Sequence, residues 1–152
     1  MPEIIPVEIY GETIQQCLDH YFLPEIVERT CSKCNSNETT KTASILVEPQ
    51  TLIIQINRYE YNREEDITTK KHSKLFSSKS LSLPKGANYW LCSYVNHWGP
   101  TPQEGHYNLV LCNEPEDTLV LLDDEEIKLN FEPDMSMMAT QYLLTYVKRS
   151  RN

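Results

Sequence analysis

The stretch from His97 to Asp124 constrains the fold of this chain most, because it describes a loop followed by two strands that must pair. The first strand begins at His106, the polar residues 113–117 form a turn, and the second strand ends at Asp123. A turn of this length joins neighbouring antiparallel strands, so we expect a β-hairpin. A four-residue loop sets His106 opposite Asp123, whereas a five-residue loop sets it opposite Asp124.

Either register would bring an imidazole and a carboxylate together. Facing residues of an antiparallel pair have Cβ atoms roughly 4.5–5.5 Å apart, so the carboxylate can accept a hydrogen bond from the ring. A histidine oriented in this way forms two of the three parts of a nucleophilic triad. The bland alternative is a strand histidine whose hydrogen bond only stabilises the fold.

The rest of the chain predicts an α+β fold dominated by an antiparallel sheet with one short helix. Thr13 and Gln16 have the spacing of a capping box, and an apolar stripe follows as far as Phe22. The run from Leu52 to Ile56 is the most apolar part of the sequence and should form a central strand. The other strands are expected over 3–10, at a sheet edge because of its prolines, and over 43–47, 51–61, 80–83, 89–96, 126–129 and 142–147, with a helical turn over 134–140.

Charge and hydropathy restrict the partners and the compartment. The 152 residues suit one domain, and 22 acidic against 14 basic residues give a net charge of −8, which argues against nucleic acid as a partner. No apolar run approaches the ~20 residues that a membrane span requires, so we expect no membrane partner, and no signal peptide is evident. Five cysteines without a secretory signal favour reduced thiols or metal ligands, and hence the cytoplasm or the nucleus.

Two of these cysteines, Cys31 and Cys34, form a CxxC knuckle between polar segments. Such a knuckle is half of a tetrahedral zinc site, and a complete site needs two more ligands. No second CxxC or HxxxH follows in the sequence. Three interpretations remain open: a zinc half-site completed from outside this chain, a vestigial knuckle without metal, or a redox dithiol.

A series of short motifs, in this order, resembles the C-terminal half of a ubiquitin-specific protease, a papain-like cysteine peptidase. They are TIQQCLDHYF, CSKC, LVEPQTLIIQINRYEY, YWLCSYVNHWG, EGHYNLVL, LVLLDDEEI and ATQYLLTY, and they extend from about Ile4 to Tyr146. Leu119 and Leu122 stand where the family usually has tryptophan and phenylalanine, which are apolar exchanges. The resemblance implies a fingers region over 1–50, a palm with the histidine box over 51–147, and a tail over 148–152.

The resemblance also implies roles for individual residues. His106 would be the general base, Asp123 the residue that orients it, and Asp124 an assisting acid. The loop that borders the cleft for the ubiquitin tail would include Trp98, Gly99, Gly105 and Tyr107, and the zinc-binding fingers would include Cys31 and Cys34. Ubiquitin or its conjugates would be the partner, with zinc as the possible cofactor.

The matching segments do not include the family's N-terminal half, which supplies the nucleophilic cysteine, the oxyanion-hole amide and the other CxxC. None of the five cysteines lies within hydrogen-bond reach of His106 in the expected sheet. We therefore expect the 152-residue chain to be inactive alone. Two hypotheses follow: the chain is part of a deubiquitinase that a further N-terminal half completes, or it is an inactive ubiquitin-binding or scaffold module.

Overall fold

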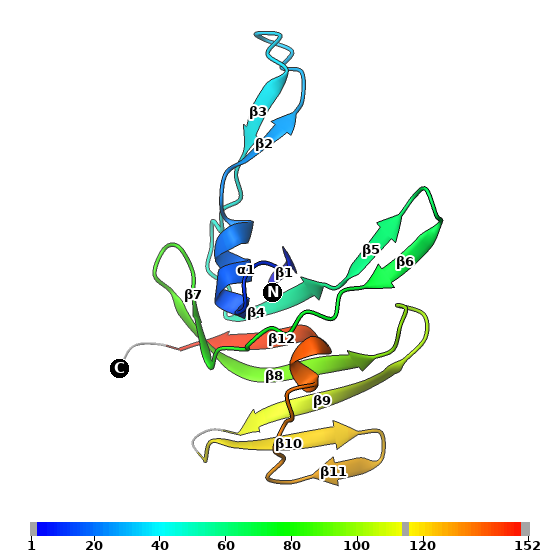
Figure 1. Cartoon of the computed structure of the whole chain (residues 1–152). Helices are drawn as coiled ribbons and strands as arrows, with labels where there is room; N and C mark the ends of the chain where they lie inside the picture. The colour runs from blue at the N-terminus through cyan, green and yellow to red at the C-terminus, as the bar shows by residue number, and fades with distance from the viewer. Residues whose placement is uncertain (1–2, 114–115, 150–152) are drawn as a thin grey trace.

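The computed structural model describes residues 3–113 and 116–149 and contains one large sheet with two projecting hairpins (Figure 1). The elements are β1 (Glu3–Glu8), α1 (Ile14–Tyr21), β2 (Glu25–Glu28), β3 (Glu38–Lys41), β4 (Thr51–Asn57), β5 (Tyr59–Asn62), β6 (Ile67–Lys70), β7 (Ser80–Ser82), β8 (Asn88–Trp98), β9 (His106–Asn113), β10 (Thr118–Asp123), β11 (Glu126–Lys128), the 3₁₀ turn η1 (Met137–Ala139) and β12 (Gln141–Lys148). The large sheet has the order β1-β4-β12-β8-β9-β10-β11, and β7 also pairs with β8. The mainly antiparallel α+β fold is thus confirmed.

The centre of the sheet is built from its most apolar strands. In β4 every second residue is buried, beginning at Leu52, as expected for a strand with one face on the core. β12 pairs with both β4 and β8 in antiparallel register. β1 is the edge strand that its prolines predict, and it joins β4 in parallel.

The helix α1 covers this core with one face. The Thr13 side chain accepts a hydrogen bond from the Gln16 backbone, and the Gln16 side chain returns to the Thr13 backbone, so the predicted capping box is confirmed. The buried face carries Ile14, Cys17 and Leu18. None of the described helices is long and apolar enough to cross a membrane.

Two hairpins project from the sheet, and the sequence pattern did not predict either of them. β2 pairs with β3 and β5 pairs with β6, and each pair is a separate two-stranded sheet. Within residues 1–50, only the β2–β3 hairpin projects from the large sheet (Figure 1). The expected division into a fingers region over 1–50 and a palm over 51–147 stays a prediction. The strand expected over 43–47 is wrong, because those residues have no strand structure. In the expected tail, Lys148 still belongs to β12 and residues 150–152 lie outside the described residues.

The register of the β9–β10 hairpin differs from both expected registers. Leu109 faces Leu122 and Asn113 faces Thr118, so continuing the ladder places Asp123 opposite Asn108 rather than His106. His106 is therefore the diagonal neighbour of Asp123. A residue two positions along a strand points to the same face, so the two side chains still share one face of the sheet.

Candidate active site

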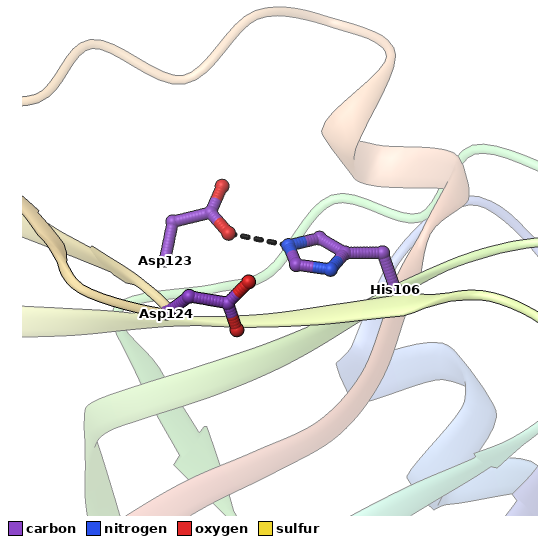
Figure 2. Close-up of side chains that lie close together, drawn as sticks. All are labelled: His106, Asp123 and Asp124. Carbon is purple, nitrogen blue, oxygen red and sulfur yellow. Dashed lines mark hydrogen bonds and ion pairs between the residues drawn. The ribbon is translucent and has the colours of Figure 1, made fainter.

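His106 and Asp123 form a hydrogen-bonded pair at the start of β9 and the end of β10 (Figure 2). Nε2 of His106 bonds Oδ1 of Asp123, and the second oxygen, Oδ2, lies 3.5 Å from Nδ2 of Asn108. A carboxylate can only accept, so Nε2 carries the ring proton in the neutral imidazole and Nδ1 is the nitrogen that remains as a base. The sequence prediction that a carboxylate orients this histidine agrees with the geometry.

The pair shifts the pKa of both partners in the directions that an ion pair requires. The hydrogen bond to Asp123 is the largest effect on the pKa of His106 and raises it above 6.5. Desolvation is the next largest effect and lowers the pKa, and the charges of Asp123 and then Asp124 raise it by smaller amounts. The same bond lowers the pKa of Asp123 below 3.8, and the Asn108 amide also lowers it. Both side chains are accessible, with relative exposures of 47% for His106 and 27% for Asp123. An oriented imidazole that solvent or a partner can reach is suited to proton transfer.

Asp124 occupies the turn that follows β10. Its backbone has a φ of 51°, which is the left-handed conformation that aspartate tolerates in tight turns. Its carboxylate lies beside the imidazole, and one ligand atom from each of His106, Asp123 and Asp124 lies within 4.8 Å of the others (Figure 2). Asp124 therefore adds negative charge near the ring, and its assisting role stays a prediction.

The residues expected to border the cleft surround the entrance to β9. Trp98 ends β8 and faces His106 across the ladder, and Tyr107 faces His97. A Cβ atom on Gly99 would lie 2.1 Å from the carbonyl oxygen of Glu104, so the neck of loop 99–105 closes too tightly for any larger residue. The expected loop residues are thus brought together next to His106.

His97, which the sequence places at the edge of the loop before β9 and near the cleft, instead lies within β8 and is buried at 2% exposure under Gly105. A Cβ atom on Gly105 would lie 2.4 Å from Nε2 of His97, and the His97 ring also lies against Tyr107, with 4.5 Å between ring centroids. Its Nδ1 lies 2.5 Å from the hydroxyl of Tyr59. Burial, followed by the nearby charge of Lys70, lowers its pKa below 6.5, so His97 is neutral at pH 7.

Lys70 connects the β5–β6 hairpin to this loop. Its Nζ donates to the carbonyl oxygens of His97 at 2.6 Å and of Gly99 at 3.0 Å. Burial lowers the pKa of Lys70 from 10.5, with a further contribution from the charge of Arg58. The β5–β6 hairpin and loop 99–105 are therefore tied together by one ammonium group.

No thiol of this chain stands near His106. Cys112 is six residues further along the same strand, about 20 Å at ~3.3 Å per residue. Trp98 of β8 faces His106, and Cys92 lies six residues before Trp98 on that strand. Cys17 is buried in α1 beside Tyr10. The remaining two cysteines lie in the turn of the β2–β3 hairpin.

These two, Cys31 and Cys34, test whether the chain can hold zinc. Hydrogen bonds from the backbone of Lys33 and Cys34, and then from the Cys34 side chain, lower the pKa of Cys31, which favours the thiolate that metals bind. Among the described residues, however, the only group of three or more potential ligands is that of His106. The knuckle therefore fits half of a zinc site and does not fit a complete one.

Comparison with known proteins assigns this arrangement to a family. The sequence model of the ubiquitin carboxyl-terminal hydrolase family (UCH) matches residues 13–146, which include α1, both hairpins and the His106–Asp123 pair. The chain belongs to the ubiquitin carboxyl-terminal hydrolase family. Its resemblance to ubiquitin-specific proteases, noted in the sequence motifs, is thereby confirmed.

Two curated relatives of the ubiquitin carboxyl-terminal hydrolase family come from yeasts. Ubiquitin carboxyl-terminal hydrolase 10 of Saccharomyces cerevisiae is 26% identical over 153 residues, which cover 90% of this chain and 19% of the relative. Probable ubiquitin carboxyl-terminal hydrolase 8 of Schizosaccharomyces pombe is 29% identical over 150 residues, covering 95% of this chain and 32% of the relative. The chain thus spans a third or less of these relatives.

Solved structures share the fold of this chain. The yeast SAGA deubiquitinating module with an Sgf73 mutant matches with a TM-score of 0.83 at 21% identity, covering 99% of this chain and 36% of the solved one. The SAGA Ubp8/Sgf11/Sus1/Sgf73 module bound to ubiquitin aldehyde matches with a TM-score of 0.80 at 20% identity, with the same coverage. At these identities the likeness establishes the papain-like fold.

Proposed function

We propose that this chain supplies the general base and its orienting carboxylate to a cysteine-type deubiquitinase. The observation that carries the proposal is the accessible His106 imidazole, whose Nε2 bonds Asp123 and whose Nδ1 is left as a base. Membership of the ubiquitin carboxyl-terminal hydrolase family supports the reaction class. Because the pair could also serve only to stabilise the fold of a binding module, family membership together with the accessible ring is what favours the enzyme.

In the proposed reaction Nδ1 of His106 takes the proton from a cysteine thiol contributed from outside residues 1–152. The thiolate attacks the carbonyl carbon of the last glycine of ubiquitin, the bond from that carbon to the amine breaks, and the imidazolium gives its proton to the departing amine. His106 then removes a proton from water, which attacks the thioester and releases ubiquitin and the thiol. Asp123 stabilises the imidazolium in both steps. The raised pKa of His106, caused mainly by its hydrogen bond to Asp123, supports this role.

Ubiquitin is the proposed partner, and loop 99–105 with Tyr107 is the proposed border of the groove for its tail. The SAGA modules bound to monoubiquitin and to ubiquitin aldehyde support this partner by analogy. The acidic residues next to His106, Glu125 and Glu126, would attract a basic tail. We further propose that Cys31 and Cys34 bind zinc only with two ligands contributed from outside this chain, and that the protein acts in the cytoplasm or nucleus.

A fluorogenic ubiquitin substrate tests the proposed function in two steps. The purified 152-residue chain should not hydrolyse it, because no described thiol reaches His106. Adding the remaining part of the Schizosaccharomyces pombe relative as a separate polypeptide, which the family resemblance expects to contain the nucleophilic cysteine, should produce turnover. The His106→Gln variant should abolish that turnover. Turnover by the chain alone, or turnover that persists in the variant, would refute the assignment.

Binding provides an independent test of the partner. We expect the chain to perturb the NMR signals of ¹⁵N-labelled ubiquitin at its last few residues, with saturation as the chain is added. The matched control is ubiquitin that lacks its last two glycines, which should bind more weakly. An unchanged ubiquitin spectrum at millimolar concentrations of the chain would remove ubiquitin as the partner.

A further inference from the structure

A pair of buried asparagines lies beside the His106–Asp123 pair in the same sheet. Asn96 of β8 is completely buried and Asn108 of β9 is 8% exposed, and the two residues face each other across the ladder. Nδ2 of Asn96 donates to Oδ1 of Asn108 at 2.9 Å. The neighbouring facing pair, Tyr94 and Val110, is part of the apolar core. Two amide side chains at such positions require hydrogen-bond partners for all their polar atoms.

The partners fix the direction in which both amides point. The hydroxyl of Thr140 lies 3.3 Å from Oδ1 of Asn96, although it also lies 2.9 Å from the carbonyl oxygen of Met137. Asn96 therefore turns its oxygen towards Thr140 and its NH₂ group towards Asn108. Because Asn108 must accept with its oxygen, its own NH₂ group points towards Asp123, at 3.5 Å from Oδ2.

The two oxygens of Asp123 consequently have different partners. Oδ1 bonds the imidazole of His106, whereas Oδ2 faces the Asn108 amide. Charges near the carboxylate include Lys128 of β11 and the neighbouring Asp124, and neither forms a hydrogen bond with it among the described residues. Among the described residues, Asn108 is thus the only side-chain amide that donates a hydrogen bond to this carboxylate.

We propose that Asn108, held in place by Asn96, is a positioning residue that keeps Oδ1 of Asp123 on Nε2 of His106. This fixes the tautomer with the proton on Nε2 and leaves Nδ1 as the base. The use of Nδ1 in thiol activation rests on the proposed function, but the effect on the tautomer is a property of this chain alone. A purely structural pair would stabilise the β8–β9 ladder and leave the imidazole unchanged.

The test is an NMR measurement of the His106 ring in the full 152-residue chain, with ¹⁵N-labelled histidine. In the wild type we expect the Nε2–H tautomer to predominate and the ring to titrate above its ordinary pKa. Asn108→Leu should move the two ring nitrogens towards the averaged shifts of a free imidazole and lower the titration midpoint. The matched control is Asn113→Leu, because this residue of the same strand contacts Glu116 and Thr118 rather than Asp123, and it should change neither value.

A second variant separates positioning from folding. Asn108→Leu leaves the Asn96 amide without its acceptor, whereas the double variant Asn96→Val/Asn108→Val removes both partners and places β-branched residues in the ladder. The double variant should fold cooperatively and show the same loss of tautomer preference as the single variant. A folded double variant whose His106 shifts and midpoint equal those of the wild type would overturn the proposal.

The wild-type chain offers a measurement that needs no substitution. As the pH is lowered through the titration of Asp123, the side-chain NH₂ signals of Asn108 should shift, because their acceptor loses its charge. The NH₂ group of Asn96 donates to Asn108 and not to a carboxylate, so its signals should shift much less. Asn108 signals that remain constant through this titration would overturn the proposal even if both variants failed to fold. None of these readouts depends on ubiquitin, so failure here is distinguishable from failure of the proposed function.

Discussion

The buried guanidinium of Arg58 provides the sharpest test of how this fold is held together. Arg58 connects β4 to β5, is only 1% exposed, and has no hydrogen-bonded carboxylate among the described residues. Its nitrogens instead donate to four backbone carbonyl oxygens at 2.6–3.2 Å, namely those of Gln141, Lys71, Ser73 and Met138. Burial lowers its pKa to about 10, so it remains charged at pH 7. One side chain thereby joins three segments of the chain.

Arg58→Met keeps an unbranched apolar stem and removes all these donors. The acceptor on Gln141 is fully buried, and an orphaned buried acceptor costs about 2 kcal/mol, whereas the three partly exposed carbonyls cost about 1 kcal/mol each because water can reach them. The variant no longer has to bury a charged group, which offsets this loss of stability by about 2 kcal/mol. We therefore expect the free energy of unfolding to fall by about 3 kcal/mol.

Urea unfolding followed by circular dichroism measures this change. Arg58→Lys retains the charge but presents three donors from one atom, so it should lose less stability than Arg58→Met. Arg63→Met is the matched control, because Arg63 is exposed in the turn between β5 and β6, and it should change stability by less than about 0.5 kcal/mol. A fall of less than about 1 kcal/mol for Arg58→Met would refute this reasoning.

Three further perturbations probe the site. The His106–Asp123 bond should stabilise the fold fully between the unfolded pKa values, near pH 3.8 and 6.5, with the stabilisation lost as pH rises through the raised His106 pKa or falls through the lowered Asp123 pKa. Asp123→Asn should flatten this stability profile and lower the His106 midpoint measured by NMR; an unchanged midpoint would contradict the ion pair. Lys70→Met should accelerate hydrogen exchange in loop 99–105 several-fold while Lys70→Arg restores protection, and equal exchange would show that the tether is dispensable. Gly105→Ala should lower the melting temperature and shift the loop's NMR signals, because its Cβ would meet a ring beneath it, and an unaltered spectrum would exclude that contact.

Local signals allowed much of the fold to be predicted. The capping box at Thr13 depends on two side chains three residues apart, and the apolar run of β4 lies within one strand. Each can therefore be recognised from a few consecutive residues of the sequence. The β2–β3 hairpin was missed because it buries almost nothing: Ile26 is 72% exposed, so no alternation of apolar residues is required. The strand expected over 43–47 failed for the opposite reason, because Leu46 and Val47 are apolar but 87% and 83% exposed.

The burial of polar residues near the site could not be predicted from a single sequence. Arg58, Asn96 and His97 are residue types that usually lie at the surface, and here they are at most 2% exposed. Each is buried because its partners come from elements distant in the sequence, such as Gln141 for Arg58 and Tyr59 for His97. Only the topology of the sheet brings these partners together, so no spacing rule could reveal them.

The contact between His106 and Asp123 was predicted correctly although the predicted register of their hairpin was wrong. The reason is the pleat of the sheet. Side chains alternate between faces, so a shift of two residues changes the neighbour but keeps the face, whereas a shift of one residue reverses the face. The four-residue loop would have set His106 opposite Asp123. Continuing the ladder beyond Leu122 and Leu109 sets Asn108 there instead, a displacement of two residues. His106 and Asp123 remain on the face that also buries Val110 and is continuous with the core. Because of this displacement, the position opposite Asp123 holds Asn108 and not His106. Asn108 carries the amide that we propose holds the Asp123 carboxylate in place.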